Sequence, residues 1–281
     1  MTSDRVSQVP TPAVPFRYAR SWLLVPAVDS AAFESGLASA ADVVILDLED
    51  GVAVGDKPHA RSLVTERLRA GCDRAWIRIN DADSAHWADD LTQLGHLPGL
   101  EGVILAKTEH GEQIEATAAR LPRELPIVAL IESAAGLEAA ADIAKRAATS
   151  RLAFGSGDFR RDTGMANDPL AMSYPRGRLT VASRAAGLPG PVDGPTLASD
   201  PAVLTTETSI AAASGMTGRL CLRAAQTDIV NRLLSPSAAD IEWAESVLER
   251  QAANEGKDSD GSYLPQLGRA EKLMELARIY A

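Results

Sequence analysis

Short apolar runs that alternate with alanine-rich segments constrain the fold of this 281-residue chain more than any other feature. The runs VVIL at 43–46 and IVALI at 127–131 hold no polar residue, as expected of parallel strands buried on both faces. Strands are predicted at residues 22–26, 43–48, 75–79, 102–106, 127–131, 152–155, 191–193 and 219–222. Helical patterns lie between them, for example at 31–40, 60–70, 111–120 and 136–148. Eight such units predict an α/β fold, a (β/α)8 TIM barrel rather than an open sheet.

The barrel is expected to occupy residues 18–234 as one domain. Prolines interrupt the first residues, so we expect residues 1–17 to form a flexible N-terminal arm and not a signal peptide. Residues 235–281 are expected to form a C-terminal helical extension that could act as a lid. Within it, Ser237 is the expected N-cap of a first helix, and a last helix is expected near the C-terminus, after a polar loop at 254–262.

The composition excludes several classes of function. Lys and Arg number 28 against 38 Asp and Glu, a net charge of −10, and no basic run offers a surface for nucleic acid. No apolar stretch reaches the roughly 18 residues of a membrane span. The two cysteines and four histidines show neither a disulfide framework nor zinc-ligand spacing. We therefore expect a cytoplasmic protein that acts on small molecules and has no nucleic-acid or membrane partner.

Charged residues follow the predicted strands at the edge where a TIM barrel carries its active site. The second strand ends in DLEDG at 47–51, the third carries Arg78, and the sixth runs into GSGD at 155–158. Lys107 follows the fourth strand and Glu132 follows the fifth. Strands would ordinarily end in turn residues, so we expect these charges to converge on one mouth.

Metal-assisted chemistry suits this set of residues. Glu132 and Asp158 are hard oxygen ligands with no His or Cys nearby in the pattern, which favours Mg²⁺, with Mn²⁺ as a second choice. Arg78 offers a planar fork to a substrate carboxylate or carbonyl. Three further carboxylates could orient metal-bound waters: Asp47, Glu49 and Asp50. The alternative is an internal ring of salt bridges, in which Lys107 simply pairs with a neighbouring carboxylate.

Other motifs are weak. The GSG segment at 155–157 is not a dinucleotide fingerprint, because Arg160 stands where the third glycine would be. The chain has no GxxxxGK[ST] phosphate loop and no GxSxG nucleophile elbow. Nucleotide binding through these motifs and serine-hydrolase chemistry are therefore disfavoured.

The order and spacing of the strand-end motifs resemble one family. The segment RSWLLVP at 20–26 followed by ADVVILDLEDGV at 41–52 is similar to the opening of citrate lyase β-subunit-like proteins of the HpcH/HpaI aldolase superfamily. The remaining matches run through the rest of the barrel and into the extension: RIN at 78–80, LAK at 105–107, IES at 131–133, FGSGD at 154–158, Asp193, Gly215, GR at 218–219 and SPS at 235–237. The LDLEDGV segment is the most specific of them.

The resemblance implies a TIM barrel that assembles as a homo-oligomer, a trimer or hexamer. It implies a lyase that makes or breaks the C–C bond of a 3-hydroxyacyl-CoA thioester such as malyl-, citramalyl- or citryl-CoA, with a 2-oxo acid as the other fragment. Glu132 and Asp158 would then hold Mg²⁺, and Arg78, Asp50 and Glu49 would act in catalysis. The residues expected at the substrate are Arg78, Asp47, Lys107, Gly155, Ser156 and Gly157.

Three departures from that family keep alternatives open. After the last strand the chain has Leu-Arg-Ala at 222–224 where many relatives have Ile-His-Pro, and Gly157 replaces a frequent Glu before the metal Asp. Tyr263 stands near the place of an acid/base Asp that a lyase presents from the lid of a neighbouring subunit. An aldolase of free 2-oxo acids without CoA, or a non-catalytic barrel subunit of a larger lyase assembly, is therefore the alternative hypothesis.

Overall fold

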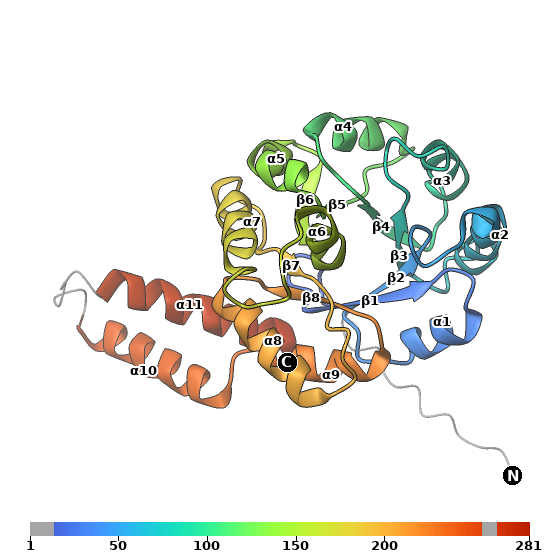
Figure 1. Ribbon diagram of the computed structural model, residues 1–281. Helices are drawn as coiled ribbons and strands as arrows, with labels where there is room; N and C mark the ends of the chain where they lie inside the picture. The colour runs from blue at the N-terminus through green and yellow to red at the C-terminus, as the bar shows by residue number, and fades with distance from the viewer. Residues whose placement is uncertain (1–13, 255–262) are drawn as a thin grey trace, which may run out of the picture.

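A closed barrel of eight parallel strands, in the order β1 to β8, forms the centre of the computed structural model, which describes residues 14–254 and 263–281 (Figure 1). The strands are β1 Ser21–Pro26, β2 Val43–Asp47, β3 Ala75–Ile79, β4 Leu100–Leu105, β5 Ile127–Ile131, β6 Thr149–Phe154, β7 Val192–Asp193 and β8 Gly218–Cys221. This confirms the predicted TIM barrel and the eight predicted strands. The boundaries of β4 and β6 differ most, since each begins two or three residues before the predicted start.

Helices surround the barrel and follow its strands in sequence. They are α1 Ser30–Leu37, α2 Lys57–Leu68, α3 Trp87–Leu94, α4 Gly111–Arg120, α5 Ala134–Lys145, α6 Ser156–Thr163, α7 Ser173–Ala185, α8 Pro201–Ala213, α9 Thr227–Leu234, α10 Ala238–Asn254 and α11 Tyr263–Tyr280, with 3₁₀ turns at Val54–Asp56 and Ala224–Gln226. None of the helices in the described ranges combines the length and the hydropathy needed to cross a membrane.

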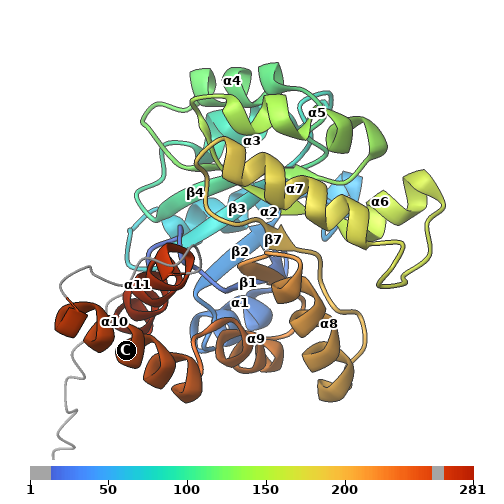
Figure 2. The ribbon, with the colours of Figure 1, turned by 90° about the vertical axis from the view of Figure 1, so that its left-hand side faces the viewer.

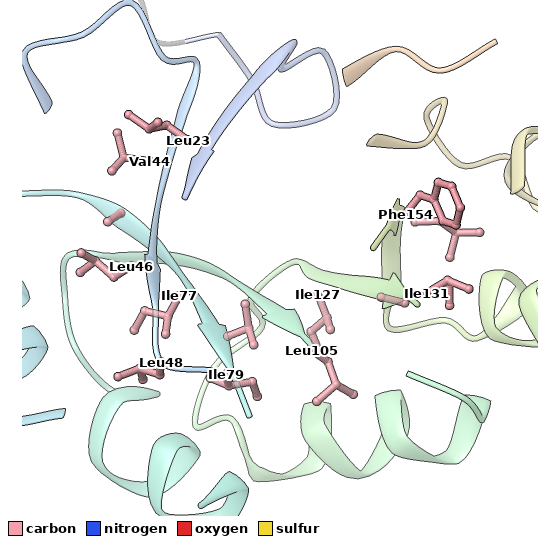
Figure 3. Packing of buried hydrophobic residues seen from close by; sticks show 14 of the residues in the cluster. Leu23, Val44, Leu46, Leu48, Ile77, Ile79, Leu105, Ile127, Ile131 and Phe154 are labelled. Carbon is pink, nitrogen blue, oxygen red and sulfur yellow. The ribbon is translucent and has the colours of Figure 1, made fainter. Parts of the chain in front are cut away.

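The alternation of side chains along each strand separates two layers of core. In β2, Val43 and Ile45 belong to a cluster drawn from alternate positions of the strands, which fills the barrel interior. Val44 and Leu46 belong to a second cluster between the barrel and its helices, part of which Figure 3 shows. Asp47 continues the inward row, so the same alternation carries a carboxylate to the mouth of the barrel.

The end of the barrel where the strands begin is closed by Arg151. Its buried guanidinium donates to the carbonyls of Phe16, Ala19 and Gly190 and to the hydroxyl of Thr217, at 2.8–3.0 Å. This buried cation therefore links β6 to the segment before β1 and to the residues that precede β7 and β8.

Strand β7 is the weakest part of the ladder. It has two residues, pairs with β6 only at Val192, and pairs with β8 at two positions. A buried ion network supplements these few backbone bonds. Asp193 accepts from Arg176 of α7 at 3.0 Å and from Arg219 of β8 at 2.8 Å, and Arg219 also reaches Glu207 of α8.

Helices α10 and α11 form a hairpin with its own small core of Ala244, Val247 and Ala270. The hairpin projects from the barrel in Figure 1, and Figure 2 shows it away from α6. Tyr280 of α11 donates to the Tyr18 carbonyl at 2.8 Å, just before β1, so the hairpin packs near the starts of the strands. Within one chain the extension therefore does not cover the mouth of its own barrel.

The division at residues 17 and 234 stays a prediction, and the polar loop after Asn254 lies outside the described residues.

Candidate metal and substrate site

The charged residues predicted at the strand ends converge at one mouth of the barrel. They come from the ends of β2 to β5 and the first turn of α6, and comprise Asp47, Glu49, Asp50, Arg78, Lys107, Glu132 and Asp158. The carboxyl ends of parallel strands meet at one end of a barrel, so their convergence follows from the topology.

Arg78 lies at the centre of the cluster and is held by Asp47. The guanidinium Nε and Nη2 donate to the two oxygens of Asp47 at 2.7 and 2.6 Å, and Nη1 lies 3.4 Å from Glu49. Desolvation opposes the charged form of Arg78, but the charge and hydrogen bonds of Asp47 outweigh it and raise the pKa. Asp47 also accepts from the backbone N–H groups of Glu49 and Gly51. Both oxygens of Asp47 are thus occupied. This residue is therefore better placed to position Arg78 and the 47–51 turn than to contact a substrate.

Glu49 links Arg78 to Lys107. The Lys107 ammonium donates to Glu49 and lies 3.7 Å from Asp50. Burial opposes the charge of Lys107, but the hydrogen bond and the charge of Glu49 outweigh it and raise the pKa of the ammonium. Lys107 is therefore a cation at neutral pH and not a base. Asp50 is the more open carboxylate, with 52% of its side chain exposed.

A buried lysine that the sequence analysis missed supports the same turn. Lys57 donates to the carbonyls of Leu48 and Glu49 at 2.8 and 2.9 Å and to Asn80 at 2.6 Å. Asn80 in turn donates to the fully buried Asp90 at 2.7 Å. No sequence motif marks Lys57, because a lysine in the first turn of a helix is ordinarily solvated.

Glu132 is packed against two backbone segments. Its Oε1 accepts from the Lys107 backbone N–H at 2.6 Å, and Lys107 has a φ of 46°, the one positive φ of a non-glycine residue in the described ranges. Such a conformation is strained and is common at functional sites. On the other side, a Cβ at Gly155 would lie 2.4 Å from Glu132 Oε2. Only glycine at 155 leaves room for the carboxylate.

The residues present fit a divalent cation. Desolvation chiefly raises the pKa of Glu132, against the lowering effects of Arg78 and the Lys107 N–H. The charges of Glu49 and Asp158 add smaller raising effects, and the pKa lies at about 8. A shared hard cation would stabilise the buried Glu132 carboxylate and the partly buried Asp158 carboxylate, which repel one another, and oxygen donors are what Mg²⁺ prefers. The described residues hold no group of three or more His, Cys, Asp or Glu side chains arranged for a metal, so the remaining ligands would be waters and substrate.

Asp158 reaches the site from the first turn of α6. Its Oδ1 forms an ion pair with Arg161 at 2.9 Å. Gly155 precedes the helix, Ser156 is half-buried beside Gly194, and Gly157 is exposed with free space around its Cα. The expected roles of these three residues at the substrate stay predictions.

A cavity of about 230 Å³ opens beside the two carboxylates. Its lining contains two cations and four acidic side chains, together with Ser133: Lys107, Arg161, Glu109, Glu132, Asp158 and Asp162. Larger hollows, of about 710 and 560 Å³, lie near the starts of the strands. The smaller cavity is the better candidate site, because it gathers the charged groups at the end of the barrel where TIM-barrel enzymes carry out their chemistry.

The altered segment after β8 helps to hold the loop between β7 and α8. Arg223 donates to the carbonyls of Leu197 and Ala198 at 2.8 and 2.7 Å, and Gln226 donates to the Thr196 carbonyl at 3.0 Å. Leu222 keeps 37% of its surface exposed at the end of the strand. The departure from Ile-His-Pro thus gives this loop two carbonyl contacts through an arginine side chain.

Sequence comparison identifies relatives over nearly the whole chain. Residues 20–224 match the HpcH/HpaI aldolase/citrate lyase family, and residues 239–281 match the HpcH/HpaI aldolase C-terminal domain. A (3S)-malyl-CoA thioesterase of Cereibacter sphaeroides is 34% identical over 231 residues, 80% of each chain. A citrate lyase subunit beta-like protein of Mycobacterium tuberculosis is 34% identical over 91% of this chain and 94% of its own.

Solved structures of similar proteins include one with ligands of the expected kinds. The CitE protein of Mycobacterium tuberculosis in complex with magnesium, acetoacetate and coenzyme A superposes with a TM-score of 0.78 at 32% identity, over 93% of this chain and 99% of that one. RipC from Yersinia pestis superposes with a TM-score of 0.70 at 30% identity, over 80% of this chain and 99% of its own. From its sequence matches and its barrel, this chain belongs to the HpcH/HpaI aldolase/citrate lyase family.

Proposed function

We propose that this protein is a Mg²⁺-dependent carbon–carbon lyase that cleaves or forms a 3-hydroxyacyl-CoA thioester of the malyl-, citramalyl- or citryl-CoA kind. The observation that carries the proposal is the meeting of Glu132, Asp158 and the Asp47-bound Arg78 at one mouth of the barrel. Family membership supports the reaction class, as does a relative named L-malyl-CoA/beta-methylmalyl-CoA lyase from Rhodobacter capsulatus, which is 30% identical.

Glu132 and Asp158 would hold Mg²⁺, and Mn²⁺ is the second ion that the same oxygen donors would accept. When bound, the ion supplies Lewis-acid polarisation of a 2-oxo acid carbonyl. Lys107 orients Glu132 through its backbone N–H and Glu49 through its ammonium. These contacts hold the Glu132 and Glu49 carboxylates in position before any ligand enters.

Arg78 is the residue that we assign to the anionic oxygens of the substrate. A guanidinium has five N–H donors, and Asp47 occupies two of them. The remaining donors can bind a substrate carboxylate or the oxygen on which charge develops as the C–C bond breaks. Because the whole chain carries a net charge of −10, such local cations and the bound ion must offset an unfavourable field for a polyanionic thioester.

Asp50 and Glu49 are the two remaining carboxylates at the mouth, and we assign them different roles in catalysis. Asp50 is half exposed and can meet a ligand, whereas Glu49 is buried and held by Lys107 and by Arg78. Their roles therefore differ: Asp50 contacts the substrate or a metal-bound water, and Glu49 keeps Arg78 and Lys107 in place.

Thioester hydrolysis is a second candidate, favoured by the similarity to (3S)-malyl-CoA thioesterases.

Incubation with (3S)-malyl-CoA and Mg²⁺ separates the two reactions. Cleavage releases glyoxylate, measured as its phenylhydrazone, and leaves the thioester intact, whereas hydrolysis releases the CoA thiol, measured with a disulfide reagent. If the protein is a lyase, glyoxylate should form and EDTA should abolish its formation. Arg78→Lys should lower the rate of glyoxylate formation by about 100-fold or more, whereas Arg74→Lys on the surface should retain the wild-type rate. Thiol release without glyoxylate would establish the thioesterase, and turnover of free 2-oxo acids alone would establish the CoA-independent aldolase.

We also infer a cytoplasmic homo-oligomer, a trimer or hexamer. The two cysteines are free, which suits a reducing compartment, and the projecting α10–α11 hairpin offers a surface to a second copy. Light scattering coupled to gel filtration measures the assembly directly, and a monomeric mass would contradict it.

A further inference from the structure

Arg161 stands apart from the cations that the proposed mechanism uses. It lines the same cavity as Lys107, but 72% of its side chain is exposed, and its partner is the Asp158 carboxylate at 2.9 Å. Arg78 and Lys107 are instead held by Asp47 and Glu49, which are not proposed metal ligands. Arg161 is thus a cation whose partner in the described cavity is a carboxylate that Mg²⁺ would need.

The pairing follows from the geometry of α6. Residues three apart lie on one face of a helix, so Asp158 and Arg161 meet, and Asp162 on the same side accepts from the Ala134 N–H at 2.8 Å. The neighbouring Arg160 does not line the cavity, and its Nε donates to the Ser156 carbonyl within the helix at 3.2 Å. Two adjacent arginines therefore differ in one respect: one engages a proposed metal ligand and the other does not.

A guanidinium and a divalent cation cannot both be the close partner of one carboxylate without mutual repulsion. An exposed i,i+3 ion pair is weak, whereas a chelated divalent ion is held strongly, so the ion would displace the arginine. The displaced side chain is long and exposed, and it can move into solvent at little cost.

We propose that Arg161 is a built-in competitor for the divalent cation: it neutralises Asp158 when the ion is absent and is released when the ion binds, which sets the metal affinity of the site. This inference rests on the proposed metal role of Glu132 and Asp158. It assigns to Arg161 a function in tuning the metal affinity rather than in the chemical step.

Titration calorimetry with MgCl₂ alone tests the competition. Arg161→Gln should bind Mg²⁺ about two- to tenfold more tightly than the wild type, the range expected for the loss of one exposed ion pair and its repulsion. Arg160→Gln, with the same change in charge one residue away, should remain within about twofold of the wild type. The difference between Arg161→Gln and the wild type should shrink at high KCl, because salt screens an exposed pair.

A second readout follows the release of the side chain directly. Modification of arginines by phenylglyoxal, mapped by mass spectrometry, should proceed faster at Arg161 when Mg²⁺ is added, while the rate at Arg160 stays constant. An unchanged rate at Arg161, or an equal effect of the two Gln variants on the Mg²⁺ affinity, would overturn the inference.

The outcomes also separate this inference from the proposed function. Mg²⁺ binding that is lost in Glu132→Gln but unchanged in Arg161→Gln would overturn the competition and leave the metal site standing. Equal Mg²⁺ affinity of the wild type and Glu132→Gln would remove the metal site and the competition with it.

Discussion

At the scale of single residues, Gly155 is the position on which Glu132 most directly depends. A methyl group there would lie 2.4 Å from the carboxylate oxygen and 2.5 Å from the Glu132 Cβ. We expect Gly155→Ala to displace Glu132, to weaken Mg²⁺ binding by about tenfold or more, and to lower stability by about 1–3 kcal/mol. Calorimetry with Mg²⁺ and urea unfolding measure both effects.

Gly157 provides the matched control, because nothing lies within 4 Å of a Cβ built there. Gly157→Ala should leave both the Mg²⁺ affinity and the fold unchanged. If the two variants bind Mg²⁺ equally well, Gly155 does not shape the site.

Glu132 should make the stability of the metal-free protein depend on pH. Its pKa is raised to about 8 in the folded state, mainly by desolvation, from an ordinary value of 4.5. The folded protein therefore binds more protons than the unfolded chain between about pH 4.5 and 8, and its stability falls as pH rises through that window. Unfolding in EDTA should show this slope, at most about 1.4 kcal/mol per pH unit, in the wild type and not in Glu132→Gln. A slope that is equal in the two proteins would contradict the raised pKa.

The sequence predicts which charged residues meet at the mouth, because strand ends in a parallel barrel share one edge. It does not predict how they are used. Asp47 and Glu49 are both predicted at the ligand, yet Asp47 is occupied by Arg78 and the backbone of the 47–51 turn. The strained backbone of Lys107 and the burial of Lys57 leave no local pattern, because both depend on neighbours that are distant in sequence.

At the scale of elements, β7 makes few backbone hydrogen bonds and depends on side-chain ion pairs for its stability. Asp193 is fully buried between Arg176 and Arg219. Replacement by the isosteric Asn should leave the buried Arg176 guanidinium without its counter-ion and Arg219 with Glu207 alone, and cost about 3–5 kcal/mol of unfolding free energy. Urea denaturation checks this, with Glu101→Gln as the control, because the Arg74–Glu101 pair is exposed. A loss below about 1 kcal/mol would mean that the network contributes little to the barrel.

Helices were less predictable than strands, and α6 shows why. Its sequence SGDFRRDT buries only Phe159, so it lacks the apolar stripe by which a surface helix is identified. By contrast, α4 at Gly111–Arg120 buries Gly111, Ile114 and Thr117, which lie three residues apart on one face, and its bounds match the prediction. The position of the helix that carries Asp158 is thus determined by its contacts with the barrel and the site rather than by an apolar pattern in its own sequence.

At the scale of the whole molecule, the hairpin and the mouth lie far apart along the barrel. The hairpin has its own core, and it contacts the barrel near Tyr18 and Arg20, where Tyr280 stacks on the Arg20 guanidinium at 4.0 Å. A chain that ends at Ser237 should therefore keep a folded barrel and its Mg²⁺ affinity, with a lower melting temperature. Circular dichroism and calorimetry test this, and loss of Mg²⁺ binding from a folded barrel would show that the hairpin shapes the site.

The two-residue β7 also determines the order in which the closed ring should open. Local unfolding begins where few backbone hydrogen bonds hold an element, and the ring has one such seam, next to Val192. Amide protons on either side of the seam should exchange with solvent sooner than those of β2 to β5, which bear most of the charged cluster. The barrel can thus open locally beside β7 while strands β2 to β5 keep their carboxylates in place. Transient opening and cation binding therefore belong to different parts of the barrel.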